Sequence, residues 1–348
     1  LGDVYKRQTL RTALAKQNVL EIIDFFELNV FESASTDSAT TMFQKMKNNS
    51  TTKYFPVNSL ENLDLWTLSQ QKNYLNVQKN ETEWLFYRHK KELNVLAKMS
   101  EDMTHLYDFV AEKMYRGVVT GANEVFIIDD TEKEKLCKTD PKSAEIIAPY
   151  ASPTNFERYG IAGAPQWFIN SHNGILVSKE DFDLYSETKD GKTFLNYKEN
   201  YFEVKNKEEH GKTKFRINRI DVEKDYTAIY KYLAKHKKKL TQRGDKGVHW
   251  TNLRNCDYVY EFANQKIIYV YTAKNHPFYL DEKGHLLNNS SYMLISSNLY
   301  LWAFLNSKLF AWYKKIKFVA YGNAEKGGRV KLDFNKMAKV PIKNLSLI

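Results

Sequence analysis

The sequence has few of the residues that break regular structure or build covalent frameworks. Its 348 residues include seven Pro, fourteen Gly and two Cys. So little Pro and Gly excludes a collagen-like or linker-rich chain. Cys137 and Cys256 lie far apart and match no metal-ligand spacing, so we expect free, buried thiols and a protein of the reducing cytoplasm. The eight His are scattered without metal-binding spacing, so we expect no metal site.

Catalytic and membrane motifs are also missing. The sequence contains no Gly-rich cofactor loop, no phosphate loop and no nucleophile elbow. Asp183 or Asp190 followed by Glu203 loosely matches a metal-dependent nuclease, but a highly charged segment often produces such a pattern by chance. No apolar run is long enough to span a bilayer, and no signal peptide is evident. We therefore expect no catalytic or cofactor-binding residue in this chain.

The sequence does have material for real cores and a concentration of positive charge. Hydrophobic residues make up 43% and aromatic residues 14%, enough for two domains of ordinary size. Residues 227–348 hold 21 Lys and Arg against 7 Asp and Glu, a balance of +14, which leaves −4 for residues 1–226. Cations that neutralise phosphates release counterions and drive duplex binding. The charge favours nucleic-acid binding, with a merely solvated basic surface as the alternative.

The two ends have a pattern of their own. Residues 3–8 are what GATGTGTATAAGAGACAG encodes, and residues 345–348 are what CTGTCTCTTATA encodes, which are the two strands of a transposase adapter used in sequencing libraries. We therefore expect residues 1–8 and 345–348 to be adapter-derived and the gene to be interrupted, so that missing motifs lie upstream.

Hydrophobic patterning predicts the elements between these ends. A helix end over 9–17, a buried strand over 19–26 and a second strand over 41–45 are typical of the closing edge of an α/β sheet. Residues 46–85 indicate a connector. Three helices are predicted over 86–113, 226–240 and 299–315, and two strands over 125–128 and 266–271. In the last helix Leu305, Leu309 and Trp312 share a face, which favours a core role. The highly charged stretch 171–225 reads as an insertion of one or two hairpins.

Several segments, in order and spacing, carry a family resemblance. They are residues 116–129, 146–150, 156–159, 166–169, 240–247, 250–254, 266–269, 278–281, 288–290, 305–310 and 339–342. Together they resemble the specificity (target recognition) domain of TaqI-like adenine-specific DNA methyltransferases of type II/IIG restriction-modification systems. Residues 9–45 are similar to the tail of that family's methyltransferase domain. The family's Asn-Pro-Pro-Tyr motif and its S-adenosyl-L-methionine-binding glycines are absent, as an interrupted gene would predict.

The resemblance implies an architecture and a function. The fold class would be an α/β remnant, the edge of a Rossmann-like methyltransferase sheet, followed by an α+β target recognition domain. Residues 9–50 would end the methyltransferase domain, 51–104 would form a partly helical connector, and 105–342 would form the recognition domain with insertion 171–225. Such enzymes flip an adenine out of the duplex and methylate its amino group. This chain would recognise double-stranded DNA, and the missing N-terminal catalytic domain would bind S-adenosyl-L-methionine.

The same resemblance suggests DNA-binding residues. Base-reading candidates lie on two turns, although an ordinary turn is the alternative for the first: Thr120, Gly121, Asn123, Ser152, Asn155 and Arg158. Phosphate-binding candidates are basic residues of the last third: Lys237, Lys238, Lys239, Arg243, Lys246, Arg254, Lys314, Lys315 and Arg329.

Two other functions stay open. A non-enzymatic specificity subunit of a multi-subunit restriction system would also bind DNA, but the methyltransferase-like residues 9–45 argue against it. A fusion with an upstream endonuclease cannot be separated from the first reading.

Overall fold

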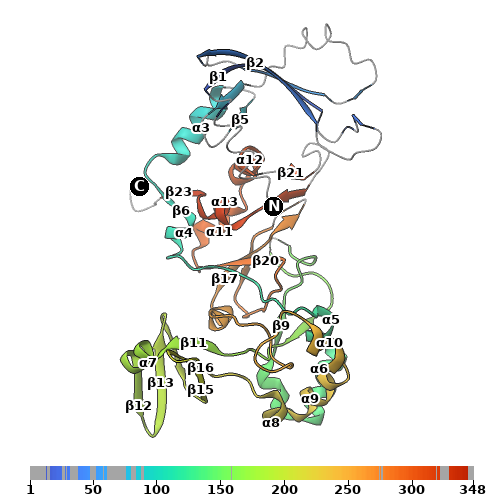
Figure 1. Cartoon of the computed structure of the whole chain (residues 1–348), viewed down its shortest axis with the longest axis vertical. Helices are drawn as coiled ribbons and strands as arrows, with labels where there is room; N and C mark the ends of the chain where they lie inside the picture. The colour runs from blue at the N-terminus through green and yellow to red at the C-terminus, as the bar shows by residue number, and fades with distance from the viewer. Residues whose placement is uncertain are drawn as a thin grey trace. The chain divides into compact units, whose positions relative to one another are not determined.

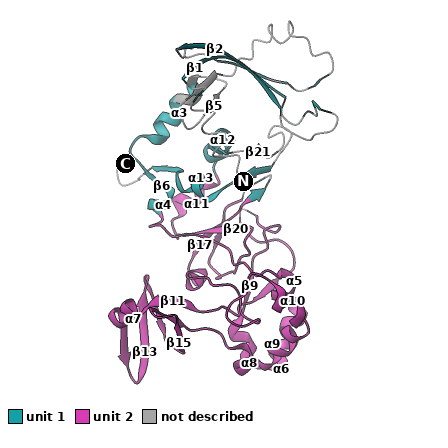
Figure 2. Ribbon diagram, in the orientation of Figure 1, with its two compact units in different colours: residues 1–109, 272–275, 307–348 teal, residues 110–271, 276–306 magenta. Residues whose placement is uncertain are grey.

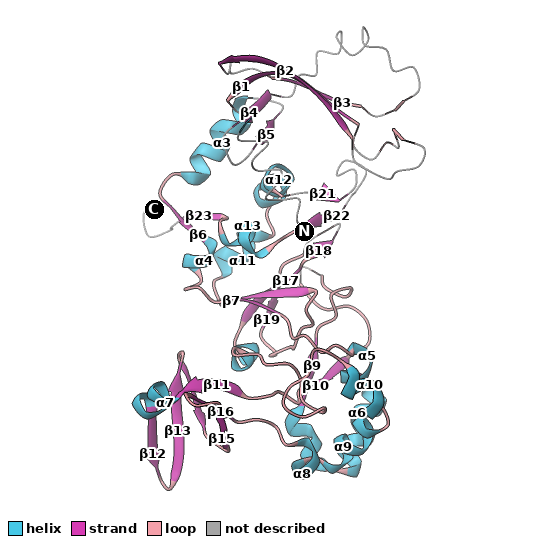
Figure 3. Cartoon of the chain, in the orientation of Figure 1, coloured by secondary structure: helices cyan, strands magenta, loops and turns pink. Residues whose placement is uncertain are grey.

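The chain divides into two compact units, each of which mixes sheets and helices (Figures 2 and 3). The computed structural model describes residues 13, 16–25, 28, 30–31, 38–47, 52–57, 59–60, 76–79, 84–87, 90–157, 159–273, 275, 277–318, 320–321 and 329–343. The predicted helix end over 9–17, both adapter-like ends and Arg158 therefore lie wholly or largely outside the described residues. Unit 1 consists of residues 1–109, 272–275 and 307–348, and unit 2 of residues 110–271 and 276–306.

The N-terminal sheet of unit 1 contains both predicted strands. The central strand β1 (Gln17–Asp24) pairs antiparallel with β2 (Ala39–Lys47) and parallel with β3 (Lys53–Pro56). Ile23 and Phe55 are buried in one cluster, and the Tyr54 hydroxyl donates to Asp24 Oδ2 at 2.8 Å. The sequence predicted a connector in this stretch. It forms the strand β3 instead, because its apolar side chains complete the core of this sheet.

The rest of unit 1 joins residues from both ends of the chain. Its other elements are β4 (Asn76–Lys79), β5 (Trp84–Tyr87), α3 (Lys90–Ser100), β6 (Met103–His105), α4 (Leu106–Phe109), β18 (Thr272–Ala273), α12 (Lys308–Lys317), β21 (Ala320–Tyr321), β22 (Arg329–Lys331), α13 (Phe334–Ala338) and β23 (Pro341–Lys343). β6 pairs antiparallel with β23, and Leu106 N donates to Val340 O at 2.8 Å. The expected domain 105–342 therefore differs from the observed units, since residues 307–343 belong with the N-terminal part.

Unit 2 is organised around a four-stranded sheet of order β19-β17-β20-β7. These strands are β7 (Met114–Arg116), β17 (Lys266–Val270), β19 (Tyr279–Asp281) and β20 (Ser291–Ile295), and α11 (Leu299–Leu305) follows them (Figure 1). The predicted strand over 266–271 is confirmed as β17, which is buried along its whole length. Its one charged residue, Lys266, is buried with Asp281, and Lys266 Nζ donates to Asp281 Oδ2 at 2.5 Å.

A second sheet of unit 2, of order β8-β10-β9, lies with a group of short helices. These elements are α5 (Asn123–Phe126), β8 (Ile127–Asp129), α6 (Asp130–Thr139), the 3-10 helix η1 (Pro141–Ile146), β9 (Ile147–Tyr150), β10 (Gln166–Ile169), α8 (Val222–Asp225), α9 (Thr227–Ala234) and α10 (Lys237–Gln242). The 3-10 helix η2 (Val259–Ala263) instead packs Val259 into the core of the insertion. The predicted strand over 125–128 begins as the helical turn α5, so only its second half is extended.

The charged insertion forms two small antiparallel sheets, as the predicted hairpins require. One has the order β11-β16-β15 and the other the order β12-β13-β14. The elements are β11 (Ile175–Ser178), α7 (Lys179–Tyr185), β12 (Ser186–Lys189), β13 (Lys192–Tyr197), β14 (Asn200–Glu203), β15 (Lys207–His210) and β16 (Lys214–Ile217). Their shared core includes Val177, Leu195 and Ile217, which are fully buried.

The three predicted helices are all shorter than expected. The first ends at Ser100, and Asp102 follows with a φ of 46°. The second is broken into α9 and α10, and the third into α11 and α12. Ser307 caps α12, because its hydroxyl accepts from Phe310 N at 3.1 Å. Because the predicted helix is broken here, its residues do not share one buried face as predicted. Leu305 is buried in α11, while Leu309 is 41% exposed in α12.

Cys137 and Cys256 are free thiols and half-buried, where the sequence predicted full burial. Among the described residues, no helix is both long and apolar enough to cross a membrane. The same part of the chain brings no three His, Cys, Asp or Glu side chains together as a metal site would need.

Candidate nucleic-acid interface

The two turns predicted to read bases lie in unit 2, at the same end of one extended segment, residues 286–288. Residues 286–288 form parallel bridges with Tyr150 on one side and Val118 on the other. Val118 N donates to Leu287 O at 2.8 Å, and Ala151 N donates to Leu286 O at 3.0 Å. Because both flanking segments run parallel to residues 286–288, the turns that follow them project from the same edge.

The first turn is held by its own side chains. Thr120 is buried, its hydroxyl donates to Asn123 Oδ1 at 2.6 Å, and the same hydroxyl accepts from Ala122 N at 3.0 Å. Gly121 has a φ of +64°, and a Cβ on it would lie 3.2 Å from the Cβ of Asp245. The buried Thr120 hydroxyl is therefore a scaffold for the turn, and the Asn123 side chain is exposed on it.

The second turn is likewise closed on itself. Thr154 Oγ1 donates to Asn155 Oδ1 at 2.9 Å and lies 3.0 Å from Ser152 Oγ. Asn155 N also donates to Ser152 O at 3.0 Å. Ser152 and Asn155 are half-buried, so this turn offers a shaped polar edge with its hydroxyl and amide groups already oriented.

Arg243 begins the basic loop, residues 243–254, and is only 7% exposed. Its guanidinium donates to Thr120 O, to Trp250 O at 3.1 Å and to Asn252 O at 2.5 Å, and it lies 4.6 Å from the Phe126 ring centroid. Burial lowers the pKa of Arg243 to about 10. A phosphate contact from Arg243 does not fit this burial. The side chain instead joins the first turn to the basic loop.

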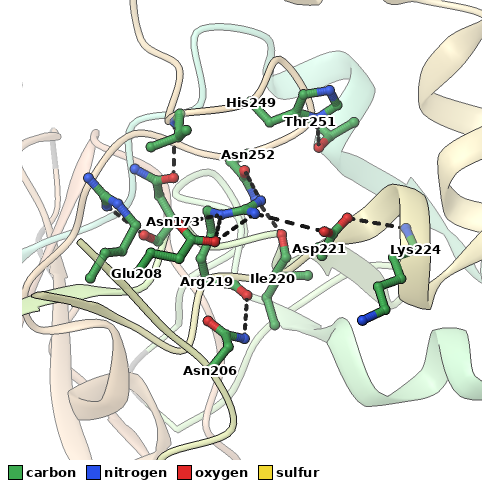
Figure 4. A network of polar contacts seen from close by, with 12 residues as sticks. Asn173, Asn206, Glu208, Arg219, Ile220, Asp221, Lys224, His249, Thr251 and Asn252 are labelled. Carbon is green, nitrogen blue, oxygen red and sulfur yellow. Dashed lines mark hydrogen bonds and ion pairs between the residues drawn. The ribbon is translucent and has the colours of Figure 1, made fainter. Parts of the chain in front are cut away.

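A network of polar contacts supports the basic loop from below (Figure 4). Asn252 is fully buried, its amide donates to Ile220 O at 2.8 Å, and its Oδ1 accepts from Arg219 Nη1 at 3.4 Å. Arg219 in turn pairs with Glu208, with Nη2 2.8 Å from Oε1. Ser171 Oγ donates to Thr251 O at 2.7 Å. These contacts tie the loop to the base of the insertion, so its backbone is fixed before any ligand arrives.

Exposed cations surround this supported loop. Lys237, Lys238, Lys239, Lys246 and Arg254 are all exposed. Some are held by neighbours: Arg254 Nη1 lies 3.1 Å from Asp245 Oδ1, and Lys246 Nζ donates to Thr241 O at 2.5 Å. Lys239 pairs with Glu124, which lowers the pKa of that carboxyl.

A shallow, open hollow of about 510 Å³ lies among these cations and is lined by Gly121, Lys235, His236, Lys238, Lys239, Gln242 and Arg243. The sequence did not single out Lys235 and His236, although the basic run around them was a sufficient signal. It gave no signal for Asn252 or Arg219, whose partners are distant in the chain. We define the cations Lys235, Lys237, Lys238, Lys239, Lys246 and Arg254 as the basic surface.

Three of the predicted phosphate-binding residues belong to unit 1. Lys314 is half-buried, and burial lowers its pKa to about 8. Lys315 and Arg329 are exposed. The structure therefore does not assign these three side chains to the basic surface of unit 2.

No protein-family model and no curated protein matches this chain. Among solved structures, the chain is similar to the type IIL restriction-modification enzyme MmeI in complex with DNA, with a TM-score of 0.51 and 10% identity over 95% of this chain and 36% of that one. The type IIG restriction endonuclease BpuSI is matched with a TM-score of 0.35 and 13% identity over 99% of this chain and 39% of that one. The chain thus spans little more than a third of each enzyme, and its fold is similar to that of part of MmeI.

Proposed function

We propose that this chain recognises a specific duplex DNA sequence, as the specificity part of an adenine-specific DNA methyltransferase of a restriction-modification system. The observation that carries the proposal is a fixed loop, surrounded by exposed cations, against which a polar turn packs. A Cβ on Gly121 of that turn would contact the side chains of Arg243 and Asp245, so the first turn and the basic loop lie next to each other. Cations would position the phosphates, and the turns would read base edges.

The catalytic part of the proposal concerns a longer polypeptide. Met42, Phe43 and Met46 on β2 are 47%, 59% and 56% exposed, an apolar edge that we propose packs against the remainder of the methyltransferase domain, of which residues 9–50 would be the end. That domain would bind S-adenosyl-L-methionine and methylate the N6 amino group of an adenine flipped out of the duplex. The shared fold with part of MmeI, and the small share of MmeI that this chain spans, support this division of labour.

The salt dependence of DNA binding tests the recognition step. We would measure the affinity of the 348-residue chain for a short duplex by fluorescence anisotropy at several salt concentrations. Replacing Lys237, Lys238 and Lys246 with Ala should reduce the slope of log K against log salt by about 2.7, because each phosphate contact contributes about 0.9. An unchanged slope would show that these lysines do not contact phosphates.

Matched controls separate this result from a general loss of charge. Lys189, Lys212 and Lys214 are also exposed but lie on the insertion. Their triple Ala variant changes the net charge by the same amount, and we expect it to keep the wild-type slope. If both triple variants lose the same slope, the binding is diffuse attraction to a cationic protein and the proposed interface is wrong.

The methylation step is tested on the longer gene that this proposal requires. We expect its upstream codons to encode an Asn-Pro-Pro-Tyr motif and a Gly-rich strand-turn-helix, and its product to transfer a methyl group from S-adenosyl-L-methionine to adenine in duplex DNA. DNA binding without any upstream methyltransferase motif would favour the non-enzymatic specificity subunit. A nuclease motif ahead of the methyltransferase would identify the fused restriction enzyme.

A further inference from the structure

Val248 is an exposed apolar side chain in the middle of the basic loop. It is 64% exposed and lies between the exposed cations Lys246 and Arg254 in the sequence. Other exposed apolar residues in the described part of unit 2, such as Leu184 and Tyr201, lie outside this loop. A single exposed apolar residue needs no explanation by itself. The backbone around Val248, however, is held in place.

Buried groups fix the backbone of Val248 from the protein side. Its N–H donates to Oδ1 of the buried Asn173 at 3.0 Å. Gly247 N donates to Asn252 O at 3.1 Å, and Lys246 forms an antiparallel bridge with Leu253. A Cβ on Gly247 would lie 2.4 Å from Asn173 Cγ, so this residue packs too closely for any side chain. Val248 is therefore presented on a loop that has little freedom to withdraw it.

The chemistry of this side chain restricts what it can recognise. Valine has no polar atom, and its branched Cβ restricts χ1, so it offers a methyl surface in a nearly fixed place. Among the groups on base edges in the major groove, the C5-methyl of thymine is the apolar one. The cations on either side of Val248 are suited to the phosphates that flank a groove.

We propose that Val248 contacts the C5-methyl group of a thymine in the major groove of the target sequence. The inference rests on the proposed DNA recognition and adds to it a specificity-determining residue and the base that it reads. Because this contact involves no charge, its contribution to the binding affinity should be independent of salt. It should depend on one thymine position in the target.

Removing the thymine methyl group tests this contact. The target would first be selected from a randomised duplex pool with the 348-residue chain, and each thymine would then be replaced by uracil, one at a time. We expect one replacement to weaken wild-type binding by about fourfold, the effect of burying one methyl group. Val248→Ala should bind the thymine and uracil duplexes equally, so that the two changes do not add.

Leu184→Ala provides the matched control, since Leu184 is 70% exposed on the insertion. We expect it to keep the full thymine-to-uracil difference. The Tm of Val248→Ala should equal that of the wild type, because its side chain is exposed. If every uracil replacement has the same effect in Val248→Ala as in the wild type, the contact is wrong while the selected target still supports the proposed function. A pool that yields no preferred sequence overturns the proposed function itself.

Discussion

Replacing Arg243 distinguishes a supporting residue from a phosphate contact. Its guanidinium donates to the carbonyls of Thr120, Trp250 and Asn252, which lie on the first turn and the basic loop. Arg243→Ala removes all three bonds and leaves those carbonyls without this donor in a buried site. Arg243→Lys keeps the charge but replaces a planar fork with a single ammonium, which cannot reach three carbonyls in the same geometry.

The size of the effect follows from these contacts. A hydrogen bond from a charged donor contributes about 1.5–3 kcal/mol, and a desolvated cation over an aromatic ring adds about 2 kcal/mol. Desolvation of the guanidinium, which also lowers its pKa, offsets part of this gain. We expect Arg243→Ala to reduce the free energy of unfolding by about 3–5 kcal/mol and Arg243→Lys by about 2 kcal/mol. The former is a large share of the roughly 5–15 kcal/mol that stabilises an ordinary domain.

Urea denaturation followed by Trp fluorescence measures this loss, and Arg254→Ala is the matched control. Arg254 is exposed on the same loop and pairs with Asp245, so its removal should change the free energy of unfolding by no more than about 0.5 kcal/mol. The reasoning is refuted if Arg243→Ala unfolds at the wild-type urea concentration while its DNA-binding salt slope falls by about 0.9. The guanidinium would then face a phosphate, as the sequence alone predicted.

Three further predictions concern buried groups of unit 2. Burial lowers the pKa of His172 to about 4, below its unfolded value near 6.5, so the folded state binds fewer protons in this window; stability in urea should fall by about 2 kcal/mol from about pH 7.5 to about pH 5, and His172→Gln should remove that loss. Gly174 has a φ of +68° and its Cβ would lie 2.3 Å from Ile217 O, so Gly174→Ala should lower the Tm more than Gly191→Ala, where φ is +73° but the space is open. Asp281→Asn leaves the buried Lys266 ammonium without its carboxylate and should cost about 3–5 kcal/mol in a urea titration, whereas the double change Lys266→Met with Asp281→Asn should recover part of it, because no unpaired charge is then buried and the amide oxygen still accepts from Lys283 N or His285 N.

Continuous apolar runs identified the buried strands, because such a run needs cover on both faces wherever it folds. β17 is the clearest case, whereas Leu20 in β1 is 43% exposed. Helix ends were harder to predict from the sequence, because each break in a helix depends on local side-chain hydrogen bonds. The Asn306 amide donates to Phe278 O at 2.9 Å and Ser307 caps the next helix, contacts that periodicity alone does not reveal.

The sequence predicted which kinds of residue form the candidate site, but it did not predict the role of each one. The sequence predicted Lys237, Lys238 and Lys239 as surface cations, and all three are exposed. Arg243 belongs to the same basic stretch, yet its acceptor Thr120 O lies 123 residues away in the chain, and only the folded loop brings the two together. A sequence shows that an arginine is present, whereas burial decides whether its charge meets solvent or carbonyl oxygens.

The pairing of β6 with β23 sets an order of events during synthesis. Residues 103–105 are synthesised well before their partner strand, residues 341–343. All residues of unit 2 have been made once residue 306 is complete, so unit 2 can fold while unit 1 still waits for its last helices and strands. A chain that ends shortly after residue 306 would therefore contain all of unit 2 but only part of unit 1, whose β6 would lack its partner strand.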